Sequence, residues 1–378
     1  MLKIVRVSSY SEFKKYKDRW DDLLSRSRAD NIFLTHEWID ACVRHFFNEE
    51  KLLILNAYDG DRLMGIAPLM IKRHKYFELP VKSVCFIGTG ISDRMGFIIE
   101  GEKENIIDMI MDYLIGIKLE WDFIDLEEIP ERAGDIRAMQ RYLAEKRIIN
   151  VHGPAKKSFY ITMDKAKEGA CQDFSKKFHR KLTKVNNKWH GLDLSFERYT
   201  GGGISGDKVF SELNAIEDRS WKGDERSGIF SNPVSLGFHK EIFSKFSDNG
   251  YLDLSILNLG SRPIAYIYNY LYGRRSYNYS IAFDKKYSKL SPGTLLMLWA
   301  LADSSSKDIK EFDFARGEGD WKARFTKDFR MHDRIRVFKN TAYSRILYYL
   351  QSGIMPYMKR RKAIYNLWMK LKGWLGWK

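Results

Sequence analysis

Strand and helix signals follow one another most closely between residues 262 and 322. Residues 264–272 and 277–283 are rich in β-branched and aromatic side chains, and a short polar stretch at 273–275 separates them. Two such runs joined by a tight turn predict an antiparallel β-hairpin. The other elements expected in this region follow the hairpin along the chain.

A helix follows the hairpin after a polar loop that begins at Asp284. Ser291 is placed to cap this helix, Pro292 fits its first position, and residues 295–302 are apolar. The N-terminus of a helix presents unpaired N–H groups and a partial positive charge, and Gly293 would let a ligand approach them. The segment therefore predicts either an ordinary capped core helix or a site for a phosphate group.

The same order of elements occurs twice along the chain. In the first half we expect strands at 3–7, 51–58, 63–72, 81–87, 123–126 and 158–162, with helices at 11–25, 35–46, 103–117 and 135–145. In the second half we expect strands at 194–199, 251–259, 264–272 and 277–283, with helices at 173–189, within 207–247 and from Ser291. This mixture predicts an α/β (α+β) fold in two copies.

Three segments are expected from this repetition. The first copy occupies residues 1–165, the second occupies residues 166–340, and a helical tail occupies residues 341–378. At 378 residues the chain is long enough for two domains with proper cores, and its 44% apolar content is that of a globular protein.

The cysteines and the N-terminus bear on the compartment. Cys42, Cys85 and Cys171 are odd in number and far apart, which argues against a disulfide framework and against a zinc site. The first residues lack the apolar core of a signal peptide, and no stretch of eighteen apolar residues occurs. We therefore expect a cytoplasmic protein without a bound metal.

The positive charge is unevenly distributed. The net charge is +15, and no acidic residue follows Asp333, whereas eleven Lys and Arg residues do. The remainder of the chain is only mildly basic, so charge gives little reason to expect nucleic acid as a partner of the body of the protein.

Several short segments, taken in order, resemble the GNAT-type acyltransferases. They are residues 33–38, 65–69 and 86–93 in the first half, and Asp284, residues 291–293, residues 312–318 and Trp321-Lys322 in the second half. The CelD-like acetyltransferases of cellulose and exopolysaccharide biosynthesis are the branch that the chain resembles most, and they are related in fold to FemX-like aminoacyltransferases. Trp321 stands where that family often has Tyr.

The resemblance implies two tandem GNAT-like domains with mixed, mostly antiparallel sheets flanked by helices. It also implies that the second domain holds an acyl-CoA, most simply acetyl-CoA. Backbone N–H groups at the helix start would hold the pyrophosphate, and the strand at 277–283 would run along the pantetheine. The expected cofactor-binding residues are Phe283, Ser291, Pro292, Gly293, Thr294 and Leu295.

Acyl transfer also needs a group that removes the proton of the nucleophile. Asp284 and Asp313 each end an expected strand, so either carboxylate is a candidate base, acting directly or through water. Arg316 and Lys322 are candidates to bind an anionic acceptor. A structural ion pair between Asp313 and Arg316 is the alternative. No Ser-His-Asp or Cys-His set stands out, which favours direct attack without an acyl-enzyme.

The expected acceptor-binding residues lie in both halves. Asp93 ends a glycine-containing loop that forms either a plain β-turn or part of a substrate site. In the resembling family an aromatic and basic cluster faces the cleft near Arg219 and Trp221. Glu318 follows the strand that ends near Arg316.

Three functions remain open at this stage. The first is an acyl-CoA dependent transferase, an N-acetyltransferase in its simplest form, acting on a sugar nucleotide, glycan precursor or other polar small molecule. The second, also implied by the resemblance, is a FemX-like aminoacyltransferase that uses aminoacyl-tRNA, the one case in which we expect a nucleic-acid partner. The third is a non-catalytic GNAT scaffold that binds a partner.

The end of the chain combines apolar, aromatic and basic residues. Residues 343–355 and 364–377 carry Leu, Ile, Tyr and Trp, and a cluster of Lys and Arg at 359–362 lies between them. Neither piece is long enough to span a bilayer, and the composition is that of an interfacial helix. The tail is expected either to dock on the inner, anionic face of the membrane as a peripheral anchor or to pack on the body of the protein.

Overall fold

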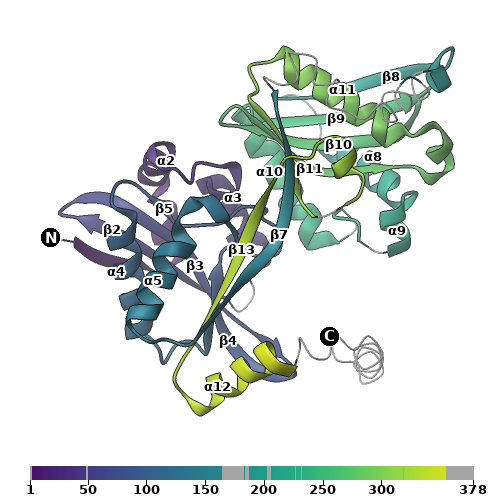
Figure 1. Cartoon of the computed structure of the whole chain (residues 1–378). Coiled ribbons are helices and arrows are strands. Elements are labelled where there is room, and N and C mark those ends of the chain that lie inside the picture. The colour runs from purple at the N-terminus through teal and green to yellow at the C-terminus, as the bar shows by residue number, and fades with distance from the viewer. Residues whose placement is uncertain are drawn as a thin grey trace. The chain divides into compact units, whose positions relative to one another are not determined.

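The computed structural model describes residues 2–47, 50–163, 183, 187–201, 206–225, 227–230, 232–317 and 319–354. The described chain forms two compact units, each built from sheet strands and helices (Figure 1). Unit 1 takes the described parts of residues 1–30, 47–155 and 332–378. Unit 2 takes those of residues 31–46 and 156–331.

Unit 1 arranges its strands in the order β1-β2-β3-β4-β6-β13, with the short β5 paired to β3. The neighbours are antiparallel except for β4 and β6, which run parallel. The strands are β1 (Leu2–Val7), β2 (Lys51–Asp59), β3 (Arg62–Tyr76), β4 (Leu79–Phe86), β5 (Ile98–Ile99), β6 (Phe123–Pro130) and β13 (Phe329–Phe338). The helices are α1 (Tyr10–Lys14), α2 (Lys17–Arg26), α4 (Lys103–Gly116), α5 (Asp135–Glu145) and α12 (Ala342–Tyr349).

The expected hairpin in unit 1 is confirmed. β2 and β3 pair residue by residue around a turn at Gly60, whose φ of +59° suits glycine. Both strands are buried over most of their length, since helices such as α2 and α4 contact the sheet that they share. Strands covered in this way read as near-continuous apolar runs rather than alternating ones.

Unit 2 arranges its strands in the order β7-β12-β11-β10-β9-β8. They are β7 (Asn150–Thr162), β8 (Leu194–Tyr199), β9 (Leu252–Leu259), β10 (Arg262–Tyr272), β11 (Arg275–Phe283) and β12 (Glu311–Arg316). Its helices are α3 (His36–Phe46), α8 (Gly206–Asp218), α9 (Trp221–Glu225), α10 (Pro233–Asp248) and α11 (Pro292–Ser306), with 3-10 turns η1 (Ile32–Leu34), η4 (Lys285–Leu290) and η5 (Lys322–Arg324). The hairpin predicted at its centre is β10 and β11.

Both faces of the β10–β11 hairpin are buried. Ile264 and Ile267 belong to an apolar core that includes Leu296 of α11. On the opposite face Tyr268 contacts His239 of α10, and Tyr270 contacts Trp38 of α3. From Ala265 onward successive residues of β10 point to opposite faces, so Ala265 and Ile267 lie on the aliphatic side and Tyr266, Tyr268 and Tyr270 lie on the aromatic side. Ile264 joins the aliphatic core because the pairing of β10 with β9 is irregular between Pro263 and Ala265.

The same strand arrangement occurs in both units, as the repeated order of elements predicts. In unit 1 the antiparallel β2, β3 and β4 are followed by the parallel neighbour β6. In unit 2 the antiparallel β9, β10 and β11 are followed by the parallel neighbour β12. The fold is thus α/β with two GNAT-like copies and mixed, mostly antiparallel pairing.

The units are not continuous in sequence, unlike the domains expected at 1–165 and 166–340. Residues 31–46, which include α3, belong to unit 2, and residues from His332 onward return to unit 1. The second half of β7 pairs with β12 in unit 2, whereas β13 pairs with β6 in unit 1. Strands that pair in the sheet thus come from distant parts of the chain.

The described start of the expected tail packs on unit 1. Leu347 of α12 is buried with Val81, Phe123 and Phe338, and the Tyr343 hydroxyl donates to the Pro80 carbonyl. The remainder of the tail, from residue 355, lies outside the described residues. Among the described helices, none is both long enough and apolar enough to cross a bilayer.

Candidate transfer site in unit 2

The parallel pairing of β11 with β12 ends at the third residue of both strands. The ladder joins Arg275–Tyr277 to Glu311–Asp313. Beyond it β11 continues to Phe283, while β12 reaches Arg316 through an irregularity in its pairing with β7. The second half of β11 therefore has an edge outside the ladder with β12, and an extended ligand can add to such an edge through main-chain hydrogen bonds.

A β-bulge lies at the point where the strands part. On β10, Tyr268 faces Ser280 but the next residue, Asn269, faces Asn278, so Tyr279 is an extra residue in β11. A bulge changes the direction of its main-chain groups, and bulges are frequent next to active sites. A re-aimed N–H group beside a ligand-binding edge is suited to stabilise negative charge on a carbonyl oxygen.

The start of α11 follows β11 through η4. Ser291 occupies the position before the helix, but its backbone is left-handed, with φ 58° and ψ 51°, and its side chain makes no capping hydrogen bond. Its amide donates to Ser288, and its carbonyl accepts from the amides of Thr294 and Leu295. Since Pro292 has no N–H, Gly293 carries the one amide of this turn without a partner among the described residues.

Gly293 is needed for close packing as well. A Cβ built on it would lie 3.1 Å from Cδ1 of Phe283, the last residue of β11. Trp221 packs against the same phenylalanine, with ring centroids 5.1 Å apart. The expected cofactor residues Phe283 and Gly293 and the expected acceptor residue Trp221 are thus brought together.

Asp284 is an anchor for the loop after β11. One carboxylate oxygen accepts from the Lys286 amide at 2.9 Å, and the other accepts from Arg219 at 2.8 Å and Arg262 at 3.1 Å. Burial raises the pKa of Asp284, but these hydrogen bonds outweigh it and leave the pKa lowered overall. Arg219 also donates to the Pro263 carbonyl. Asp284 and Arg219 thus bind other groups of the protein. These contacts suit a structural role better than base catalysis by Asp284 or acceptor binding by Arg219.

Asp313 lies opposite Tyr277, where the β11–β12 ladder ends. It is almost completely buried, and its Oδ1 accepts from the Ser158 hydroxyl at 2.8 Å and from the Ala315 amide at 2.7 Å. Arg330 lies 3.8 Å from its Oδ2, so an arginine pairs with this carboxylate. A buried carboxylate at the parting of the strands keeps Asp313 a candidate base.

Lys322 stabilises the irregular end of β12. Its ammonium group donates to the carbonyls of Ala315 at 3.0 Å and Arg316 at 2.7 Å. Ala315 has a φ of +56°, which is uncommon for a residue with a side chain. Lys322 therefore holds the backbone of Ala315 and Arg316, which directly follows Asp313 in β12. Glu318, the remaining residue expected here, lies outside the described residues.

Asp93 belongs to unit 1 rather than to unit 2. It follows β4 in a loop and is buried together with Ser92 and Arg94. The Ile87 amide continues the pairing of β4 with β3 by donating to the Pro68 carbonyl, and the Met95 amide joins the loop to β6 by donating to the Glu128 carbonyl.

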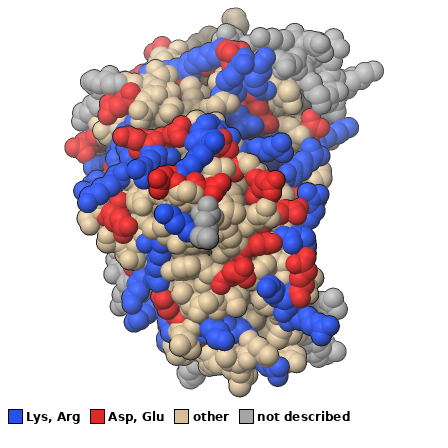
Figure 2. Space-filling view, turned by 90° about the vertical axis from the view of Figure 1, so that its left-hand side faces the viewer, with Lys and Arg blue, Asp and Glu red and all other residues tan. Residues whose placement is uncertain are grey.

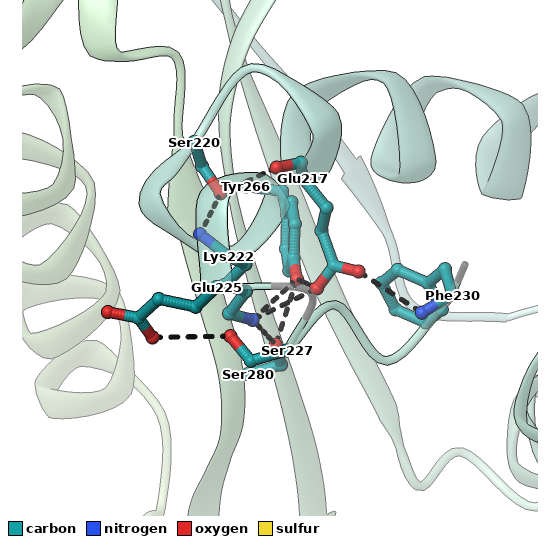
Figure 3. A network of polar contacts seen from close by, with 8 residues as sticks. All are labelled: Glu217, Ser220, Lys222, Glu225, Ser227, Phe230, Tyr266 and Ser280. Carbon is teal, nitrogen blue, oxygen red and sulfur yellow. Dashed lines mark hydrogen bonds and ion pairs between the residues drawn. The ribbon is translucent and has the colours of Figure 1, made fainter. Parts of the chain in front are cut away.

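A buried polar network on the aromatic face was not predicted from the sequence. Lys222 of α9 donates to Glu217 at 3.0 Å, to the Tyr266 hydroxyl at 3.1 Å and to the Ser280 hydroxyl at 2.6 Å (Figure 3). Glu217 also accepts from Tyr266 at 2.7 Å. Glu217 and Lys222 lie five residues apart in the sequence, but nothing local indicates that they bind Tyr266 and Ser280. Those contacts span 44 to 58 residues and follow from the fold alone.

Among the described residues, no group of three His, Cys, Asp or Glu side chains could hold a metal ion.

Comparisons with known proteins bear on the fold and on part of the sequence. Residues 176–323 match the family model described as an acetyltransferase (GNAT) domain. No curated protein matches the chain. The crystal structure of FemX is similar over 92% of this chain and 99% of its own, with a TM-score of 0.61 and 12% sequence identity.

Two further solved structures show the same likeness. A conserved protein of unknown function from Bacteroides thetaiotaomicron covers 90% of this chain and 100% of its own, with a TM-score of 0.55 and 10% identity. L-PGS from Bacillus licheniformis covers 86% and 92%, with a TM-score of 0.53 and 11% identity. Such low identities show the fold alone. Residues 176–323 are thus similar in sequence to the acetyltransferase (GNAT) domain model, and the chain as a whole shares the fold of FemX.

Proposed function

We propose that unit 2 is an acyltransferase that takes its acyl group from an acyl-CoA, in the simplest case acetyl-CoA. The observation that carries the proposal is the parting of β11 from β12 beside the bulge at Tyr279. The edge of β11 would bind the pantetheine arm. At roughly 3.3 Å per residue the chain runs about 16 Å from Tyr279 in β11 to Asp284 just after it, comparable to that arm when extended.

The residues around β11 would divide the task. The Gly293 amide and the positive end of α11 would face the pyrophosphate. The main chain at the bulge would stabilise the oxygen of the thioester carbonyl as charge develops on it.

The reaction itself is a direct displacement. The nitrogen or oxygen of the acceptor attacks the thioester carbon, the carbon–sulfur bond breaks, and coenzyme A leaves with the thiol sulfur. The acceptor loses its proton to a base, for which Asp313 is the candidate because its carboxylate lies where β11 and β12 part. The sulfur takes up a proton on leaving.

The acceptor is proposed on the CelD-like resemblance to be a sugar nucleotide, an exopolysaccharide precursor or another polar small molecule. Isothermal titration with coenzyme A tests the donor, and no binding up to millimolar concentration by folded protein would reject it. A screen of amines and sugars with acetyl-CoA, read by mass spectrometry, then identifies the acceptor. If Gly293→Asp left activity in cells unchanged, a non-catalytic binding role would be favoured.

An aminoacyl-tRNA donor is the competing function, favoured by the fold shared with FemX and L-PGS. On the face shown in Figure 2, basic and acidic side chains are interspersed rather than gathered by sign. A surface of this kind lacks the continuous positive field that attracts an RNA backbone. Filter binding with tRNA at rising salt distinguishes the two: tight, salt-sensitive tRNA binding without coenzyme A binding would favour the aminoacyl donor.

A further inference from the structure

The segment from Glu217 to Phe230, which we call the strap, connects α8 to the start of α10. One side chain holds both of its ends, because the Glu217 carboxylate belongs to the first residue and accepts from the amide of the last, Phe230, at 3.1 Å. Within it the Lys222 amide donates to the Ser220 hydroxyl at 3.0 Å. Glu217 thus links the two ends of the strap, and it also binds Tyr266 of the hairpin (Figure 3).

Lys222 attaches the middle of the strap to the sheet. The exposed fractions of the Lys222 and Glu217 side chains are 13% and 1%. The three N–H bonds of the ammonium are matched by Glu217, Tyr266 of β10 and Ser280 of β11. With Tyr266 donating to Glu217, Ser280 donates its own proton to Tyr266 at 2.8 Å, and every donor is used once.

The site of attachment is next to the bulge. Ser280 follows Tyr279, the extra residue in β11. Burial lowers the pKa of Lys222, whereas the charge of Glu217 and the hydrogen bond to it act in the opposite direction. Replacing a buried ion pair by uncharged residues is often neutral for stability, so its presence calls for a reason other than stability.

The outer side of the strap holds the residues that follow the bulge. Trp221 packs on Phe283, and Arg219 binds Asp284. The Arg219 carbonyl accepts from the Lys285 amide at 3.0 Å, and Asp224 pairs with the Lys285 side chain. Phe283 in turn contacts Gly293 at the start of α11. The strap therefore contacts both ends of the proposed donor edge, the bulge through Lys222 and the pyrophosphate end through Arg219 and Trp221.

We propose that Lys222 is a positioning residue for the donor, which holds the bulged half of β11 and the loop 284–293 in one arrangement through the strap. This inference rests on the proposed function for the identity of the ligand, but the positioning itself can be measured without it. Lys222 acts through Ser280 and the strap and needs no contact with the reacting atoms.

The test uses the double variant Lys222→Met, Glu217→Gln, which removes both charges and leaves no buried ion without its partner. The matched control is Lys103→Met, Asp135→Asn in unit 1. There a Lys likewise binds a buried carboxylate that also accepts from a backbone amide, that of Phe97. The readouts are hydrogen exchange of segments 279–293 in free protein, Tm, and the Kd for coenzyme A.

We expect exchange in 279–293 to accelerate at least tenfold and coenzyme A affinity to fall at least tenfold in the Lys222 variant. The control should keep both values within twofold, with a comparable change in Tm. Unchanged exchange and unchanged Kd in the Lys222 variant would overturn the inference. If wild-type protein fails to bind coenzyme A but exchange still accelerates, the proposed function fails while the positioning role stands.

Discussion

Phe283 and Gly293 join the end of β11 to the first turn of α11, with a separation of only 3.1 Å between Cδ1 of the ring and the position of a Cβ on the glycine. Trp221 contacts the same ring and limits how far it can move. The turn expected to bind an anion is therefore also a packing contact. A substitution at Gly293 changes both the packing and the expected anion binding.

At this contact we predict different results for two substitutions. Gly293→Ala gains about 1 kcal/mol of helix propensity but has to displace Phe283, so stability should stay near that of the wild type. Gly293→Asp adds bulk and a negative charge and should abolish coenzyme A binding. Thermal melts and isothermal titration measure the two effects. Gly116→Ala in α4, where a Cβ meets open space, is the control and should bind normally. Undiminished affinity in Gly293→Asp would place the pyrophosphate elsewhere.

Asp284 should contribute stability that depends on pH. Its pKa is lowered in the folded protein, so its contribution is present above the ordinary value of 3.8 and is lost as pH falls through the folded pKa. Asp284→Asn should cost about 1–3 kcal/mol at pH 7, because Arg219 and Arg262 lose a charged partner. Urea unfolding should show this difference shrinking below about pH 4. A difference that stays constant between pH 7 and pH 3 would contradict the assignment.

Asp313 should be needed for catalysis more than for folding. Asn at this position can still accept from the Ser158 hydroxyl and the Ala315 amide, so the fold should survive. Loss of a general base should lower kcat by roughly 10²–10⁴-fold with the acceptor found by screening. Ser158→Ala, which removes one hydrogen bond, should lower it far less. Equal activity of Asp313→Asn and wild type would assign proton removal to another group or to water.

The two contiguous halves of the chain should not fold independently. A fragment of residues 166–378 lacks α3, whose Trp38 packs on Phe238, Phe246 and Tyr270, and it lacks the β7 residues that pair with β12. We expect no cooperative thermal transition by circular dichroism from that fragment alone. Expression together with residues 1–165 should restore one. A cooperative transition in the isolated fragment would show that unit 2 folds without α3 and without the β7 residues that pair with β12.

The tail is proposed to bind an anionic membrane surface through residues 355–378. The cut has to follow Ile354, because α12 contributes Leu347 to the core of unit 1 and a shorter protein would lose that packing. Full-length protein should float with anionic vesicles at low salt, at roughly 1 kcal/mol for each basic residue near the surface. The protein ending at Ile354 should stay at the bottom. Equal behaviour of the two would exclude the tail as the anchor.

Local pattern was sufficient for the elements and for their repetition. The β10–β11 hairpin, the β2–β3 hairpin and the helix that starts at Pro292 follow from side-chain periodicity and turn chemistry, which act over a few residues. The α/β class and the two copies follow from the order of those elements. The region of the proposed donor site was predicted in the same way, because a helix start after a strand is itself a local signal.

Tertiary structure decided what each polar side chain does. The sequence offered Asp284 and Asp313 as equivalent carboxylates, yet one is held by two arginines and the other lies buried where two strands part. It offered no reason to join Lys222 to Ser280, which is 58 residues away. Nor did it indicate that α3, from the first part of the chain, belongs to unit 2, or that most of β13, from the last part, belongs to unit 1. Such pairings depend on which strands become neighbours, and that choice is made by burial of the whole sheet rather than by any local run of residues.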